Sequence, residues 1–310
     1  MSLKVVIIGG AGFIGTATAN KLIHEGYRVL VLDTGRRLNR SSFFLRNIDV
    51  IEYDFQTPID AEPFFNDAYA VIHMGCSTIP SSSMHSLAYE TLANVAPSVQ
   101  LFEAASRQGV NRVIFTSSGG TVYGDAVSIP ISEKTVLNPI SGYGASKVSI
   151  ESYLQVISHT CGFKGISLRI ANPYGPYQLL GSPIGVIARY ISQGCAGVDL
   201  QVWGDGSVIR DYIYINDLVD AIASVVKSST IHSGSYNIGT GVGFSINDII
   251  NVISLHAEKK ISVLYQDSRF FDVKSVVLDI TKIYDEIGWR PLIGVNEGIK
   301  MLISANKNCI

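Results

Sequence analysis

A glycine-rich turn between a short apolar strand and a helix is the feature that most constrains the fold. Lys4 to Ile8 is a β-branched run, Gly10-Ala11-Gly12-Phe13-Ile14-Gly15 follows it, and Phe13 to His24 has helical spacing. This order places glycines at the amino terminus of a helix, where backbone N–H groups are unpaired and carry a partial positive charge. Such a turn lets the backbone approach a pyrophosphate, although the pattern alone also fits an ordinary tight turn.

An acidic residue at the end of the next strand supports a dinucleotide site. Arg28 to Leu32 is the second strand, and Asp33 follows it, eighteen residues after Gly15. An acid at about this distance binds the adenosine ribose, which favours NAD. Arg36 and Arg37 come next and could instead hold the 2′-phosphate of NADP, so NADP is the alternative cofactor. At the turn itself we expect the cofactor to contact Gly9, Gly12, Phe13, Ile14 and Gly15.

Strand-like and helix-like segments alternate through the first half of the chain. Further strands are predicted at Val50 to Asp54, Ala70 to His73 and Asn111 to Thr116, separated by helix-length segments. Long helices are predicted at about 85–108 and 143–160. Alternation of this kind implies right-handed crossovers, and therefore an α/β fold with a doubly wound parallel sheet of the Rossmann type.

The composition argues against several classes of partner. Charged residues make up 16% of the chain and the net charge is −2, so the basic surface that nucleic acid requires is not expected. The cysteines (Cys76, Cys161, Cys195 and Cys309) lack the spacing of zinc ligands or of a disulfide framework, which predicts no metal site and fits a reducing cytoplasm. No apolar stretch has the length of about 18 residues that predicts a transmembrane helix.

Polar and aromatic residues follow the third and fourth strands, at the edge where ligands of such sheets bind. Asp54 and Phe55 are placed to contact an adenine ring, although Asp54 fits equally well as the cap of a turn. The run from His73 to Ser77 is interpreted as a loop facing the cofactor, with His73 and Gly75 in contact with it. A single histidine without neighbouring ligands does not indicate a metal site.

A tyrosine and a lysine, Tyr143 and Lys147, stand four residues apart at the start of a predicted helix. Residues at this spacing share a helix face. A fixed positive charge within about 4–6 Å favours the phenolate and lowers a pKa that is ordinarily near 10, which creates a proton acceptor. Ser117 and Ser118 supply hydroxyls at the end of the fifth strand, with Ser118 twenty-five residues before Tyr143. Pairs at this spacing are common on helix surfaces, so the interpretation depends on the other motifs of the chain and not on the spacing alone.

Together these features resemble the extended short-chain dehydrogenase/reductase family, and within it the nucleotide-sugar 4-epimerases typified by UDP-galactose 4-epimerase. The resemblance covers nearly the whole chain. It implies NAD as the cofactor and a UDP-sugar as the substrate. The residues that carry it are the glycine-rich turn with Asp33, the His73 loop, Ser117-Ser118, Tyr143-x-x-x-Lys147, Asn172-Pro173 and Val208 to Ile213.

The resemblance also implies catalytic roles. Tyr143, as phenolate, would take the proton from a sugar hydroxyl. Lys147 would lower the pKa of Tyr143 and hold the nicotinamide ribose. Ser118 would donate a hydrogen bond to the developing oxyanion. Ser117 is the alternative for that hydroxyl, because Gly119-Gly120 makes this loop one residue longer than in the type enzyme.

The substrate residues implied by the resemblance lie in the carboxyl-terminal half. Asn172 would contact the nucleotide sugar and Arg210 its pyrophosphate, while Arg269 and Asp272 would hold a phosphate and the nucleotide ribose. Val276, seven positions after Arg269, corresponds to the position that governs room for an N-acetyl group. Its medium-small side chain predicts activity on UDP-N-acetylhexosamines as well as UDP-hexoses.

Two domains and a homodimer are expected. Residues 1–171 would form the NAD-binding Rossmann domain, with a return at about 211–239, and residues 172–310 a smaller α/β substrate domain. For Arg210, a surface ion pair with Asp211 is the alternative to binding the pyrophosphate. Helices 85–108 and 143–160 resemble those that pair across a two-fold axis in this family, which suggests a four-helix-bundle dimer.

The predicted reaction is epimerisation at C4 of the sugar, through a transient 4-keto sugar. A dehydratase would need an acid and a base beside the catalytic hydroxyl, where this chain has Ser118-Gly119-Gly120, so dehydration is disfavoured. Keto-sugar reductases and decarboxylases remain alternatives. A non-catalytic NAD-binding protein is the alternative of a different class, and the presence of both Tyr143 and Lys147 argues against it.

Overall fold

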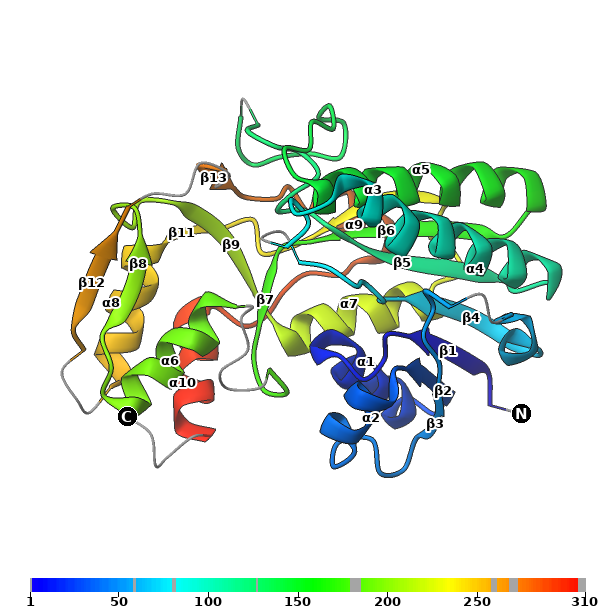
Figure 1. The fold of residues 1–310 in the computed structure, drawn as a ribbon, viewed down its shortest axis with the longest axis horizontal. Helices are drawn as coiled ribbons and strands as arrows, with labels where there is room; N and C mark the ends of the chain where they lie inside the picture. Colours follow the sequence, from blue (N-terminus) through cyan, green and yellow to red (C-terminus); the bar gives the residue numbers. More distant parts are fainter. Residues whose placement is uncertain are drawn as a thin grey trace.

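The computed structural model describes residues 2–57, 60–79, 82–126, 128–178, 185–257, 261–267 and 273–305. A large parallel sheet with helices on both faces forms one part of the molecule, and a smaller unit of short strands and helices lies beside it (Figure 1). The predicted α/β fold with a doubly wound parallel sheet is therefore confirmed.

The large sheet has seven strands, all parallel. They are β1 (Lys4–Ile8), β2 (Arg28–Asp33), β3 (Asp49–Glu52), β4 (Ala68–His73), β5 (Arg112–Ser118), β6 (Lys164–Ile170) and β10 (Gly234–Ile238). Their spatial order is β10-β6-β5-β4-β1-β2-β3, so the chain reverses its direction across the sheet between β1 and β4. Ligands of open parallel sheets bind at such a switch point, outside the carboxyl ends of the strands.

The side chains of β1 explain why helices cover both faces of this sheet. Val5 and Ile7 belong to one apolar core, and Val6 and Ile8 belong to the other. Successive side chains of a strand point to opposite faces, so a continuous apolar run must be buried on both sides. All four side chains are at most 1% exposed.

Two helical layers provide that cover (Figure 1). On one face lie α1 (Phe13–His24), α2 (Gly35–Ser41) and α7 (Ile215–Lys227), and on the other lie α3 (Leu87–Glu90), α4 (Ala96–Arg107) and α5 (Gly142–Cys161). A 3₁₀ turn (Glu62–Phe65) precedes β4, and α9 (Thr281–Ile287) packs on β10. Within the described ranges, no helix combines the length and the apolar character needed to cross a bilayer.

The helix predicted at about 85–108 is interrupted, whereas the helix predicted at 143–160 is found as α5. A π-helical segment, Thr91–Val95, separates α3 from α4. Pro97 lies in the first turn of α4 and has no N–H to donate, so the regular hydrogen-bond pattern is broken at this point and a wider turn precedes it.

Within the described residues, the smaller unit combines two short sheets with three helices. Its strands are β7 (Asn172–Tyr174), β9 (Ile209–Tyr214), β11 (Gly243–Ser245) and β13 (Ser275–Val276) in one sheet and β8 (Leu200–Trp203) with β12 (Val263–Gln266) in the other. Its helices are α6 (Val186–Ala196), α8 (Ile246–His256) and α10 (Val295–Ala305).

The chain passes between the two parts more than once. It leaves the large sheet after β6 and enters the smaller unit at β7. Within the predicted return at about 211–239, β10 pairs with β6 and α7 packs on α1, but β9 pairs with β7, β11 and β13 of the smaller unit. The return to the large sheet therefore begins at α7 and not at residue 211.

Candidate active site

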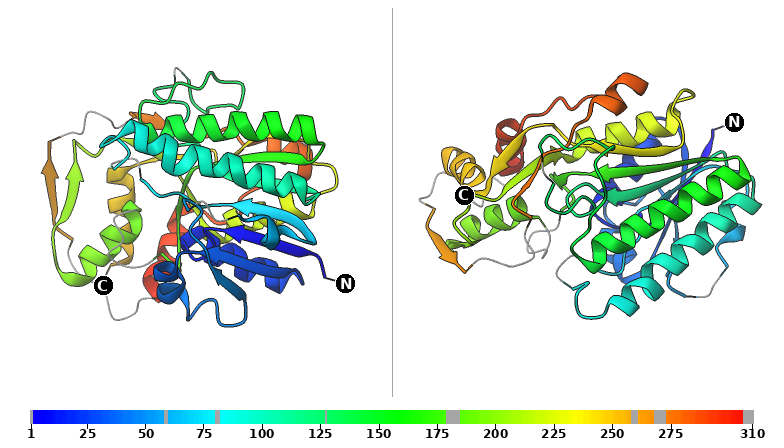
Figure 2. Two further views of the ribbon diagram at one scale, coloured as in Figure 1. Left: turned by 45° about the vertical axis from the view of Figure 1, so that its right-hand side comes forward. Right: turned by 90° about the horizontal axis from the view of Figure 1, so that it is seen from above.

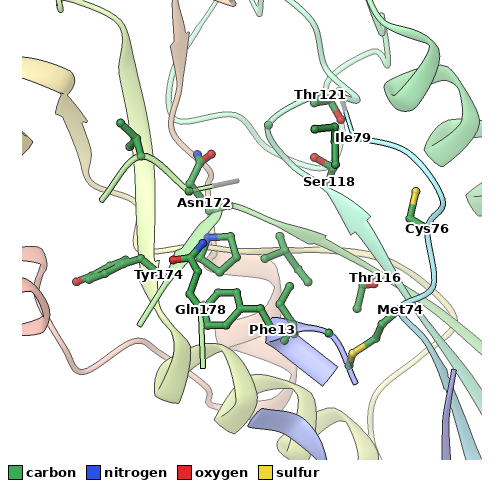
Figure 3. Close-up of a pocket in the computed structure, with 18 of the residues that line it drawn as sticks. Phe13, Met74, Cys76, Ile79, Thr116, Ser118, Thr121, Asn172, Tyr174 and Gln178 are labelled. Carbon is green, nitrogen blue, oxygen red and sulfur yellow. The ribbon is translucent and has the colours of Figure 1, made fainter. Parts of the chain in front are cut away.

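A cavity of about 760 Å³ lies between the large sheet and the smaller unit. The glycine-rich turn and the carboxyl ends of the central strands line one side, and residues of α6, β8 and β9 line the other. Figure 3 shows Ser118 and Thr121 on one side of the opening and Asn172 across from them. A cavity at a topological switch point, with polar groups converging on it, is the expected position for a ligand site.

The glycine-rich turn presents bare backbone to this cavity. Gly9 has a φ of 77°, which favours glycine, and its N–H donates to the carbonyl of Leu32 at 2.8 Å. A Cβ on Gly15 would lie 2.6 Å from the backbone of Gly10, so α1 can approach the turn only because residue 15 has no side chain. Gly12 begins α1 without a side-chain cap, which leaves helix N–H groups for a ligand anion.

All five residues predicted to contact the cofactor at the turn line the cavity, namely Gly9, Gly12, Phe13, Ile14 and Gly15. Asp33 lies beneath them and is buried. Its carboxylate accepts hydrogen bonds from the N–H of Ala11 at 2.9 Å and of Thr34 at 2.8 Å. Burial raises the pKa of Asp33, while the charge of Arg37 and these N–H groups oppose that rise. The carboxylate retains lone pairs for ribose hydroxyls, so the turn and Asp33 fit a dinucleotide.

Tyr143 and Lys147 share one face of α5 at the cavity. Ser141 caps this helix, because its hydroxyl accepts a hydrogen bond from the N–H of Gly144 at 3.1 Å, which fixes Tyr143 in the first turn. The Lys147 ammonium lies 5.4 Å from the centre of the Tyr143 ring and donates to the carbonyl of Thr116 at 2.9 Å. The pair thus lies beside the carboxyl end of β5.

The electrostatics of the protein alone differ from the expectation that Lys147 lowers the pKa of Tyr143. Burial raises the pKa of Tyr143, and the nearby Cys76 and Glu90 raise it further. Burial also lowers the pKa of Lys147, an effect that Cys76, Glu151 and Glu90 oppose. In the protein alone, desolvation is therefore the dominant influence on the pKa of Tyr143.

Three hydroxyl groups share the cavity with this pair. Ser117, Ser118 and Thr121 all line the cavity. The hydroxyls of Ser117 and Thr121 are buried and have no hydrogen-bond partner among the described residues. Thr121 was not among the predicted site residues, although it follows Gly119-Gly120 in the same run as the two serines. A substrate oxygen is a suitable partner for such buried donors.

The residues predicted after the third and fourth strands take no part in the described lining of the cavity. Asp54, Phe55, His73 and Gly75 are not among the described residues that line the cavity. His73 is fully buried, its Nε2 is 2.8 Å from the hydroxyl of Ser98, and its ring packs near Phe55. Burial lowers the pKa of His73 to about 3, with Lys147 adding to the effect, so the ring is neutral. The described ranges contain no cluster of histidine, cysteine or acidic residues that could hold a metal ion.

Only some of the predicted substrate residues are found in the described lining of the cavity. Asn172 and Arg210 line the cavity, and the Asn172 amide donates to the carbonyl of Asp211 at 3.1 Å. Asp211 is fully buried and accepts hydrogen bonds from Thr240, Gly241 and Leu278, so a surface ion pair with Arg210 is the wrong description of it. Arg269 and Asp272 lie outside the described residues.

Val276 does not reach the cavity in the described part of the chain. Its side chain is buried in β13, and it pairs in register with Arg210 of β9. Three further arginines, Arg37, Arg40 and Arg189, line the cavity as well. The signal for Arg37 was its place just after Asp33, whereas nothing in the local sequence distinguishes Arg189.

Comparisons with known proteins identify a family and several similar sequences. Residues 5–239 match the model of the NAD dependent epimerase/dehydratase family. A putative UDP-glucose 4-epimerase of Methanocaldococcus jannaschii is 31% identical over 311 residues, covering 98% of each chain. A dTDP-4-dehydro-6-deoxyglucose reductase of Escherichia coli is 31% identical over 307 residues, covering 97% of this chain and 96% of the relative.

A solved structure is similar over the same length. The crystal structure of UDP-glucose 4-epimerase from Thermotoga maritima with UDP-glucose has a TM-score of 0.87 and 30% identity, covering 98% of this chain and 99% of that one. The family match extends over most of the large sheet, including the glycine-rich turn, Tyr143 and Lys147. On this agreement of sequence and fold, the chain belongs to the NAD-dependent epimerase/dehydratase family.

Proposed function

We propose that this protein uses bound NAD to interconvert C4 epimers of a UDP-sugar, either a UDP-hexose or a UDP-N-acetylhexosamine. The observation that carries the proposal is that Tyr143, Lys147 and Ser118 line the same cavity as the glycine-rich turn and Arg210. A proton acceptor, a hydroxyl donor, a dinucleotide turn and a phosphate-binding cation thus converge on one space. This set of groups suits oxidation and re-reduction of a sugar hydroxyl.

Each of these residues has a separate role in the proposed reaction. Tyr143, as phenolate, takes the proton from the C4 hydroxyl and returns it to the product. NAD held by the glycine-rich turn and Asp33 would supply hydride transfer at C4, so that hydride leaves one face of the sugar and returns to the other. The positive charges of Lys147 and of oxidised nicotinamide both favour the phenolate, against the burial that raises its pKa. Ser118, with Ser117 as the alternative, donates a hydrogen bond to the oxygen at C4.

The remaining residues hold the substrate and the cofactor. Arg210 would bind the diphosphate, and Asn172 would contact the nucleotide sugar. Val276 pairs with Arg210, so its size would act on the position of β9 and not by direct contact with an N-acetyl group. We include UDP-N-acetylhexosamines on the basis of this medium-small residue. Rejection of acetylated sugars with good turnover of plain ones would remove that part of the proposal.

The decisive experiment measures interconversion of UDP-glucose with UDP-galactose, and of the N-acetylated pair, by chromatography. We expect conversion with no reduced cofactor added, because the cycle leaves NAD unchanged. Conversion that stops without NAD(P)H would refute epimerisation. The matched variants are Tyr143→Phe, which removes only the proton acceptor, and Tyr153→Phe on the exposed side of the same helix. We expect turnover to fall about 10²- to 10⁴-fold in the first and to stay unchanged in the second.

A keto-sugar reductase is the second candidate, because the E. coli reductase is as similar in sequence as the M. jannaschii relative. A reductase uses the same Tyr–Lys pair but consumes reduced cofactor in proportion to product. The stoichiometry of NAD(P)H oxidation therefore separates the two reactions. A decarboxylase or dehydratase would instead release carbon dioxide or water. The same chromatography would then show the altered nucleotide sugar as a new product.

We also propose a homodimer and a cytoplasmic location. The helices α4 and α5 lie side by side on the outside of the molecule (Figure 2). Leu92, at 71% exposed, and Val156, at 61%, stand out from this helical layer, and Tyr153 is about half exposed. Burying this face against a second copy would remove exposed apolar surface from water. Sedimentation of Val156→Lys should give monomers, and an unchanged dimer would refute this interface.

The free thiols Cys76, Cys161 and Cys195 support a reducing compartment.

A further inference from the structure

The side chain of Glu90 is buried close to the Tyr143–Lys147 pair and has no role in the function proposed above. Glu90 ends α3 and is 2% exposed. Its Oε2 accepts hydrogen bonds from the hydroxyl of Thr78 at 3.0 Å, the amide of Asn94 at 3.1 Å and the hydroxyl of Ser146 at 3.3 Å. Ser146 directly precedes Lys147, and Thr78 lines the cavity.

The hydrogen bonds indicate that this side chain is an anion. The N–H and the hydroxyl of Ser77 both donate to Oδ1 of Asn94, at 2.9 Å each, so the amide nitrogen of Asn94 must face Glu90. Three donors then converge on a single oxygen, Oε2. Charge-assisted hydrogen bonds to a carboxylate are stronger than neutral ones, which favours the ionised form. The other oxygen, Oε1, has no partner among the described residues, so a proton placed on it would be a buried donor without an acceptor.

Among the charged groups around the Tyr143–Lys147 pair, Glu90 and Lys147 are the two whose opposite charges can compensate each other. Lys147 is 3% exposed, and no carboxylate of the described residues lies within ion-pair distance of its ammonium. Glu151, on the same helix, is already paired with Arg169 at 2.7 Å. His73, on β4 behind Lys147, is buried and neutral. A buried cation and a buried anion, neither with an ion-pair partner among the described residues, thus occupy the same region.

We propose that Glu90 is a positioning residue for the Tyr143–Lys147 pair: its carboxylate is the counter-charge of the buried ammonium and ties the Thr78 loop to α5. A buried charge is costly unless an opposite charge compensates it. The proposal rests on the function proposed above, in which Tyr143 is the base. It adds a residue that acts through this pair without touching the reacting atoms.

The direction of the pH effect follows from the sign of the charge. The groups that face the pair are Cys76 after β4, Glu90 on α3, and Glu151 on α5. Glu90 raises the pKa of Tyr143 and also raises that of Lys147. Removing its charge must therefore lower both pKa values. The acidic limb of the kcat/KM profile reports the essential base, and the alkaline limb reports the essential cation, so both limbs move to lower pH.

The test compares pH profiles of sugar interconversion in wild type, Glu90→Gln and Glu103→Gln. The last variant removes the same charge from an exposed position on α4. We expect both limbs to move to lower pH in Glu90→Gln and to stay in place in Glu103→Gln. Thr78→Val removes one hydrogen bond but keeps the charge, so its limbs should not move. Unmoved limbs or a shift to higher pH in Glu90→Gln would overturn the proposal, as would an equal shift in Thr78→Val.

Two further measurements keep the proposal testable without turnover. Ultraviolet titration of Tyr143, taken as the difference between wild type and Tyr143→Phe, should show ionisation at lower pH when Glu90→Gln is introduced into both. Thermal midpoints of Glu90→Gln, Lys147→Met and the double variant form a cycle, and the double variant should be more stable than the sum of the single effects predicts. Additive effects would contradict the counter-charge. A wild type that titrates as expected but converts no sugar would refute the proposed function alone.

Discussion

Two glycines of the same turn should fail in different ways when they are replaced by alanine. A Cβ on Gly15 would lie 2.6 Å from the Cα of Gly10 and 2.6 Å from the carbonyl oxygen of Gly9. Carbon atoms normally stay about 3.5–4.0 Å apart, so α1 must move away from the turn by roughly 1 Å. A Cβ on Gly12 meets its nearest atom at 3.4 Å, which is ordinary contact, and the backbone there, with φ −78° and ψ 177°, suits alanine.

The magnitudes follow from these distances. Overpacking against backbone atoms costs Gly15→Ala about 3 kcal/mol, and the better helix propensity of alanine returns about 1 kcal/mol. The net loss of about 2 kcal/mol should lower the thermal midpoint by about 4 °C. Gly12→Ala should lose under about 1 kcal/mol of stability. Gly12 lines the cavity at the helix terminus, where the proposed pyrophosphate would approach closely, so NAD should bind at least about tenfold more weakly.

Thermal melting of the nucleotide-free protein and calorimetric titration with NAD measure the two effects separately. Gly294→Ala is the matched control, because a Cβ there has no neighbour within 4 Å. The expected pattern is a stability defect in Gly15→Ala and an affinity defect with near-normal stability in Gly12→Ala. The reasoning is refuted if Gly12→Ala is the less stable variant, or if Gly15→Ala melts like the control.

Two further predictions concern buried charges. The pKa of His73 is about 3 in the folded protein against an ordinary 6.5, so the unfolded chain binds more protons and stability falls as pH drops below 6.5. This amounts to about 2 kcal/mol at pH 5, and His73→Asn should lose less stability than wild type between pH 7 and pH 5 in denaturant titrations; equal losses would contradict it. Arg169→Met leaves Glu151 buried without its partner and should cost about 3–5 kcal/mol, whereas the double variant Arg169→Met/Glu151→Met should recover more than half of that. A double variant as unstable as Arg169→Met would show that lost packing, and not the unpaired charge, is responsible.

The chain order of the large sheet was predictable because each of its elements has a local signature. The strands β1 and β4 are apolar runs of strand length, and α1 and α5 have helical spacing. The positions of Gly15 and Tyr143 within these elements are likewise fixed by spacing along the chain. Physical rules for parallel sheets then place the turn and the carboxyl end of β5 at one edge. The position of each of these residues within its strand or helix depends on its neighbours in the sequence, so the amino-acid pattern alone is sufficient to locate it.

Other properties depend on which distant segments pack together, and no local pattern records them. The strand β9 lies in the smaller unit because it pairs with β7 and β13, whose residues are far from it in the chain. His73 faces a buried cluster of aromatic rings instead of the cavity.

The balance of charge at the proposed catalytic pair belongs to the same class of property. Burial raises the pKa of Tyr143, although the spacing to Lys147 predicts a fall, because desolvation is set by the whole surrounding structure. Glu90 lies 53 residues before Tyr143 and enters its environment only through the packing of α3 on α5. The sequence by itself determined the fold and the cofactor turn, and it was sufficient to propose Tyr143 as the proton acceptor. Only the tertiary structure decided the electrostatic environment in which that acceptor works.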